Sequence, residues 1–322
     1  MGRLRARWMA GVGLVGFIAL LGSTVPVRAA PVSTEGRYVT VNDPHAGSAS
    51  GQGTFPSGIN DHGTIVGNYY DAKNRGFGFM YADGRFVPIN DPHAGKGAFQ
   101  GTDPLSINSG GVIAGFYLDS GNVFHGFVFD HGRFTTLDDP AAGTGASEGT
   151  LAEGNDAAGL VTGGYFDAIG VFHGFMFSRG QYTTVDDPHA GTGAGQGDEL
   201  DGPNNRGAIA GTLIDGSGVN HGFIYRSGHF SRLITDPKAG TSTGQGTSSY
   251  CVNNRGVVAG QYVDSSGVTH GFTLHDGVFA TIDDPTGVST SVQCLSNTGS
   301  LVGFFVDSNG AAHGFVRTSG DD

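Results

Sequence analysis

Aspartate and histidine recur along this chain at a spacing that could support acid–base or metal chemistry. In five places an Asp stands six residues before a His, and carboxylate–imidazole pairs serve as acid–base couples or metal ligands. The aspartates are Asp71, Asp119, Asp167, Asp215, Asp264 and Asp307, and the histidines are His125, His173, His221, His270 and His313. Phe77 replaces the His in the first copy. Because a residue present in every copy meets a need of every copy, we interpret both sets as structural: the Asp caps a turn and the His anchors the next strand.

A second polar set falls in segments of about 12 residues that are rich in Gly and follow an Asp-Pro pair. It comprises His45, His93 and His189, the glutamines Gln52, Gln100, Gln196 and Gln245, and Glu148 at the equivalent place in the third copy. Two interpretations stay open. Each Gln could bond the backbone of its own loop, or these side chains together with Glu199 could form a polar ring that binds a ligand.

Metal and catalytic signatures are weak. The Asp-Pro aspartates, some preceded by a second acid, leave room for weak Ca²⁺ sites, but the alternating Asp pattern of a calcium loop is absent. We therefore expect no cofactor, with Ca²⁺ as the alternative. The sequence holds no His-Glu-x-x-His motif and no phosphate-binding loop. Three acids break the repeat pattern and would be the first residues to consider in an enzyme: Glu148, Glu153 and Glu199.

These residues belong to a block of about 48 residues that occurs six times. Its marker is a Gly-Phe pair, at Gly78, Gly126, Gly174, Gly222, Gly271 and Gly314. Each internal copy has four strand-sized runs separated by turn signals. The last copy ends before its fourth run, and the matching piece, Arg37 to Pro44, stands near the N-terminus. This pattern predicts an all-β, six-bladed β-propeller of four-stranded antiparallel blades, closed by pairing of the N-terminal strand into the C-terminal blade.

The expected domain organisation is a single propeller at 37–322. Its closing strand is 37–42, and the blades are 53–90, 101–138, 149–186, 197–234, 246–283 and 289–318. Residues 1–29 have the arginines, the apolar run and the Val-Arg-Ala end of a secretory signal peptide, and 30–36 would be a short linker. We expect no transmembrane segment after cleavage of this peptide.

Two further features bear on location and partners. The formal charge is −12, and removal of the four arginines of the signal peptide would make it −16, so nucleic acid is a poor partner. Cys251 and Cys294 occupy the same register position in adjacent copies. Export favours a disulfide between them, whereas blade geometry allows one only within about 7 Å of the ring axis. Both the bonded and the free state stay open.

The repeat resembles the bacterial extracellular HAF-type repeat. The residues that carry the resemblance run from Ile113 to Phe129 and from Gly132 to Pro140, together with Ser106 to Gly115 and its copies. It covers nearly all of the chain after the signal peptide. The resemblance implies export and a repeat propeller, and it brings no catalytic residue.

We therefore expect an exported monomer, periplasmic or extracellular, that binds a protein, peptide or surface glycan through its loop face without catalysis. An extracellular hydrolase or lyase that acts on polysaccharide or a small molecule through asymmetric acidic residues is the first alternative. A structural protein of the cell envelope is the second.

Overall fold

The computed structural model describes residues 36–318, all of whose regular elements are β-strands. The predicted signal peptide lies outside the described residues. Within 36–318 no helix has the length and hydrophobicity that crossing a membrane requires.

Residues 36–318 form twenty-four strands, and the strands after the first follow one another in sets that repeat the sequence period. We use the term blade for each set. Blade 1 holds β2 (Gly53–Ile59), β3 (Ile65–Tyr70), β4 (Gly76–Ala82) and β5 (Arg85–Pro88). Blade 2 holds β6 (Gly101–Ile107), β7 (Ile113–Leu118), β8 (Phe124–Asp130) and β9 (Arg133–Leu137). Blade 3 holds β10 (Gly149–Asn155), β11 (Val161–Phe166), β12 (Phe172–Ser178) and β13 (Gln181–Thr184).

The second half of the chain continues in the same way. Blade 4 holds β14 (Gly197–Pro203), β15 (Ala208–Ile214), β16 (Asn220–Arg226) and the short β17 (His229–Phe230). Blade 5 holds β18 (Gly246–Val252), β19 (Val258–Val263), β20 (Thr269–His275) and β21 (Val278–Ile282). Blade 6 holds β22 (Ser289–Leu295), β23 (Leu301–Val306) and β24 (Ala312–Thr318).

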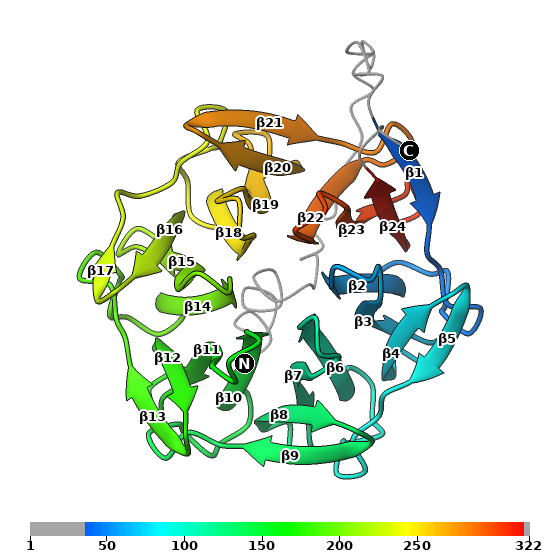
Figure 1. The fold of residues 1–322 in the computed structure, drawn as a ribbon, viewed down its shortest axis with the longest axis horizontal. Coiled ribbons are helices and arrows are strands. Elements are labelled where there is room, and N and C mark those ends of the chain that lie inside the picture. The colour runs from blue at the N-terminus through cyan, green and yellow to red at the C-terminus, as the bar shows by residue number, and fades with distance from the viewer. Residues whose placement is uncertain (1–35, 319–322) are drawn as a thin grey trace.

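The blades lie in a ring around a central axis, with the first strand of each nearest the axis (Figure 1). Within a blade, consecutive strands pair antiparallel, as β2 with β3, β3 with β4 and β4 with β5. The N-terminal strand β1 (Arg37–Thr40) pairs antiparallel with β24, so that Thr40 lies opposite Phe315. The two ends of the described chain are therefore joined by backbone hydrogen bonds in one sheet.

Turn chemistry explains how the strands are connected. Between the third and fourth strands of the first five blades, a two-residue loop such as Asp83-Gly84 has positive φ at both positions, 49° and 75° in this case. That is the requirement of a type I′ hairpin turn, which Gly meets without strain. Between the first and second strands, Asn60 Oδ1 accepts hydrogen bonds from the backbone of His62 and Thr64. The turns predicted from the recurrent Asn and Gly residues are confirmed.

The Gly-Phe marker residues form the core between blades. Phe79, Phe127, Phe175, Phe223, Phe272 and Phe315 are each at most 1% exposed. Phe127 of blade 2 packs in one cluster with Val66 of blade 1, which links neighbouring blades. The Gly that opens most innermost strands supports the same contact. At Gly149 φ is 119°, and a side chain would meet the carbonyl of Phe124 on β8 of the preceding blade.

Candidate functional site

A β-bulge in each innermost strand directs one side chain toward the ring axis. In β2 the register shifts between Pro56 and Gly58, which leaves Ser57 as the extra residue. Equivalent shifts occur in β6, β10, β14, β18 and β22. Because a bulge leaves its extra residue out of the ladder and turns its side chain, it can place functional groups outside the sheet.

The bulged residues line one cavity at the centre of the ring. They are Ser57, Leu105, Glu153, Asp201, Tyr250 and Gln293, one from each blade. Phe55, Asn68, Asp103 and Phe304 complete most of the wall, and the space measures about 640 Å³ including the part open to solvent. We call this space the axial cavity.

The axial cavity has two chemically different halves. Blades 2 to 4 contribute the carboxylates of Asp103, Glu153 and Asp201, whereas blades 5, 6 and 1 contribute a phenol, an amide and a hydroxyl. The backbone repeats around the axis, but no two of the six bulged side chains are of the same type. A ligand at the axis would therefore meet a single asymmetric site.

Glu153, Glu199 and Asp201 form a compact acidic cluster at this wall. All three residues are buried, and one oxygen from each lies within 4.8 Å of the other two. Burial raises the pKa of Glu153 to about 8. It also raises the pKa of Glu199 and Asp201 well above the usual range, and the neighbouring carboxylates of the cluster add to both shifts. A carboxyl in this state holds its proton near neutral pH unless a cation compensates its charge.

Two other cavity groups have shifted pKa values. Burial raises the pKa of Asp103 to about 7. The pKa of Tyr250 is also raised, first by burial and then by the carboxylates of Asp201 and Glu199. Tyr250 therefore presents a neutral hydroxyl, which can donate and accept hydrogen bonds.

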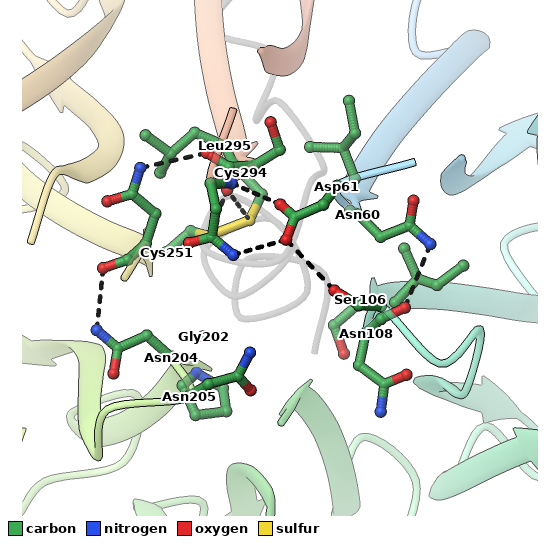
Figure 2. A pocket seen from close by; sticks show the side chains of 18 of the residues that line it. Asn60, Asp61, Ser106, Asn108, Gly202, Asn204, Asn205, Cys251, Cys294 and Leu295 are labelled. Carbon is green, nitrogen blue, oxygen red and sulfur yellow. Dashed lines mark hydrogen bonds between the residues drawn. A yellow bond between two sulfur atoms is a disulfide. The ribbon is translucent and has the colours of Figure 1, made fainter. Parts of the chain in front are cut away.

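A second hollow lies on the same axis, at the end where the first and second strands of each blade are connected (Figure 2). Here the turn residues form hydrogen bonds from blade to blade. Asn60 Nδ2 donates to the carbonyl of Asn108, and Asn204 Nδ2 donates to that of Asn253. The backbone N–H and side-chain amide of Asn297 both donate to the Asp61 carboxylate, which connects blade 6 to blade 1. We interpret this ring as structural.

The disulfide lies between the two hollows. Cys251 on β18 and Cys294 on β22 are bonded, with their Cα atoms 5.1 Å apart, and Figure 2 shows the sulfur bridge at the axial wall. The pair thus meets the distance condition set by the ring geometry. It joins blades 5 and 6 beside the axial cavity.

The recurrent Asp and His residues take up turn and hairpin positions. Asp119 Oδ1 accepts hydrogen bonds from the backbone N–H groups of Gly121 and Val123, and Asp71, Asp167, Asp215, Asp264 and Asp307 make the same pair of bonds. His125 stacks on Tyr117 with a centroid distance of 4.9 Å. His173, His270 and His313 stack in the same way on Tyr165, Tyr262 and Phe305. His221 contacts Asp215 at 3.2 Å. In blade 1, Phe77 keeps the stack on Tyr69 while Arg75 binds Asp71.

The loop residues predicted as ligand-binding hold their own loops. Gln196 Oε1 accepts from the N–H of Gly193 while its Nε2 donates to the carbonyl of Gly216. Gln52, Gln100 and Gln245 and the carboxylate of Glu148 accept from their own loops in the same way. His45, His93 and His189 each contact the preceding Asp-Pro aspartate, and their side chains are 77%, 73% and 69% exposed. These contacts are those of the loop-bonding interpretation, and a ligand role for these residues stays a prediction.

The acids that break the repeat pattern separate into two places. Glu153 and Glu199 meet in the acidic cluster, whereas Glu148 lies in a connecting loop. Four residues of the cavity wall are not identified as site residues by the repeat pattern: Asp103, Asp201, Tyr250 and Gln293. Asp201, Tyr250 and Gln293 each stand directly before Gly or another small residue in an innermost strand. Asp103 stands two residues before the bulged Leu105. A bulge must be known before these positions can be assigned to the axis.

Comparison with known proteins supports the fold. No protein-family model and no curated protein sequence matches this chain. Among solved structures, a variant of the Aleuria aurantia lectin in complex with α-methyl-L-fucoside superimposes with a TM-score of 0.51 and 12% identity, over 87% of this chain and 91% of the lectin. The same lectin with Fucα1-6GlcNAc gives a TM-score of 0.50 at 11% identity, over 81% of this chain and 91% of the lectin.

Another structure of that lectin is described as a six-bladed β-propeller, and it superimposes with a TM-score of 0.47 at 11% identity, over 81% of this chain and 89% of the lectin. At these identities the likeness concerns the fold. The chain is an all-β protein with the fold of the six-bladed β-propellers.

Proposed function

We propose that this protein is an exported recognition propeller of the HAF-type repeat family that binds a glycan in its axial cavity. The observation that carries the proposal is the set of six different bulged side chains around one axis. Repetition alone would give equivalent side chains, so the differences at the axis are what a single specific site requires.

The chemistry of the neutral half suits a sugar. Gln293 and Tyr250 can donate and accept hydrogen bonds with hydroxyl groups, and Phe55 and Phe304 form an apolar part of the wall. The fold is shared with a lectin whose structure contains α-methyl-L-fucoside, which makes glycans the first ligand class to test. Fucose itself is one member of the panel.

Closure of the ring belongs to the same proposal. Pairing of β1 with β24 would complete blade 6 as a fourth strand and hold blades 6 and 1 at a fixed distance from the axis. The signal peptide would direct the chain to the periplasm or the extracellular space, where the disulfide can form.

A glycan array followed by calorimetry tests the proposal. Gln293→Ala removes an amide at the axis, and the control Gln196→Ala removes one at the rim. We expect Gln293→Ala to weaken binding of the best array ligand by about tenfold or more, equivalent to about 1.4 kcal/mol, and Gln196→Ala to leave it nearly unchanged. The opposite order would move the site to the loops, and an array without any binder would exclude the glycan.

A hydrolase is the second candidate, because clustered carboxyls with raised pKa values are also found in active sites. Release of reducing ends from a polysaccharide by the wild type, abolished in Glu153→Gln, would support it. Turnover that persists in that variant would exclude the cluster as its source.

A further inference from the structure

Within the described part of the chain, the acidic cluster places three buried carboxyl groups in the axial wall without a positively charged neighbour. Glu153 and Asp201 are each 8% exposed and Glu199 is 7% exposed. Among residues 36–318, no arginine, lysine or histidine contributes to the pKa shifts of these three carboxyls. Burying a carboxylate without a positive partner costs several kcal/mol, on the order of magnitude found for buried ions. As carboxylates, the three groups therefore require a cation.

Unsatisfied oxygen atoms at the same wall point to a ligand independently of the charge. Glu153 Oε2 is buried and has no hydrogen-bond partner. Asp103 Oδ1, which belongs to the same cavity lining but not to the cluster, is in the same state. Buried polar atoms are nearly always bonded in folded proteins, so the free oxygen of Glu153, which belongs to the acidic cluster, indicates a missing partner.

We propose that Glu153, Glu199 and Asp201 bind one divalent cation of the calcium type in the wall of the axial cavity. Calcium–oxygen distances of about 2.3–2.6 Å place any two ligands of one ion no more than about 5 Å apart. The oxygens of the three residues, all within 4.8 Å of one another, meet that condition. Carboxylate oxygens select hard cations such as Ca²⁺, Mg²⁺ and Mn²⁺ over soft ones.

The strands explain why these three side chains meet. Glu153 is the bulged residue of β10, and Asp201 lies in the bulge of the neighbouring β14. Glu199 stands two residues before Asp201 on the same face of β14. Both strands are held by their own blades, so the ligands are positioned without the cation.

The site does not require the glycan. The experiment is calorimetry of the chelator-treated protein, expressed from its full sequence, with Ca²⁺ as the only ligand. We expect one Ca²⁺ per chain and a higher melting temperature with Ca²⁺ than with the chelator alone. Failure of glycan binding would leave this result unchanged, so the two proposals are tested separately.

Two carboxyl-to-amide variants localise the site. Asp201→Asn should weaken Ca²⁺ binding by about tenfold or more, whereas Glu148→Gln, which places in blade 3 the amide that four other blades carry in their loops, should leave it unchanged. Circular dichroism verifies the fold of both variants. The proposal is overturned if the wild type binds neither Ca²⁺, Mg²⁺ nor Mn²⁺ at millimolar concentration, or if folded Asp201→Asn binds Ca²⁺ as the wild type does.

Discussion

At the scale of residues, one position shows how a single side chain departs from its repeat. In five blades the second residue of the innermost strand is Thr, whose hydroxyl accepts a hydrogen bond from the Asp-Pro aspartate N–H, as Thr150 does from Asp139 at 2.8 Å. Blade 4 has Asp198 instead, which accepts from Asp187 through Oδ2. Its Oδ1 is buried and has no partner.

We expect Asp198→Thr to stabilise the protein by an amount that grows with pH. Burial raises the pKa of Asp198 to about 8 from 3.8. The folded state therefore binds the proton more tightly than the unfolded state, and wild-type stability falls as the pH rises from about 4 to 8. The advantage of the variant over the wild type should grow by several kcal/mol between about pH 4 and pH 8, because one pKa unit corresponds to about 1.4 kcal/mol.

Urea unfolding at pH 5 and pH 8 measures this difference. The acidic cluster also makes stability depend on pH, but it is present in both proteins, so its contribution cancels in the difference between variant and wild type. A variant whose advantage is equal at both pH values would show that Asp198 keeps an ordinary pKa.

At the scale of elements, β1 is the segment on which closure depends. Val41 follows β1, donates its N–H to the carbonyl of Gly314 and is 1% exposed, whereas Val39 within the strand is 38% exposed. We expect Val41→Ala to lower the free energy of unfolding by about 1–3 kcal/mol, because it leaves a void among buried apolar side chains. Val39→Ala, the matched control, should change it by less than about 0.5 kcal/mol.

Denaturant titration of both variants measures the free energy of unfolding and shows whether β1 is paired with β24 in solution. Equal, small effects would mean that the N-terminal segment does not contribute to the stability of the ring.

Some elements of the fold are predictable from the sequence and others are not. The turns are predictable from their Asn, Asp and Gly residues, because each turn type has its own residue requirements. The repeat period likewise predicts that Phe127 and its copies occupy equivalent buried positions. The positions of the bulges cannot be predicted from the sequence, because a strand with one extra residue contains the same kinds of residues as a regular strand. The sequence therefore drew attention to Glu153 and Glu199 as irregular residues but could not bring them together or add Asp201.

At the scale of the whole molecule, the disulfide constrains the relation of blades 5 and 6. Cys251 and Cys294 are separated by 43 residues, a loop length for which chain entropy predicts a stabilisation of up to about 4 kcal/mol. The double variant Cys251→Ser and Cys294→Ser should therefore have a lower melting temperature, because its free energy of unfolding lacks this contribution of up to about 4 kcal/mol. Ser is suitable because Ser106 occupies the equivalent position in blade 2.

Thiol labelling of the denatured, unreduced protein accompanies this comparison. Two reactive thiols per chain, or a double variant as stable as the wild type, would contradict a structural disulfide.

The central claim is that a repeating ring carries one asymmetric ligand site at its axis. The stoichiometry of glycan binding tests it most directly, because the alternative sites recur in the connecting loops. Calorimetry with the ligand identified on the array should give one glycan per chain. A stoichiometry of several equivalent glycans per chain would contradict the axial site and assign recognition to the repeated rim.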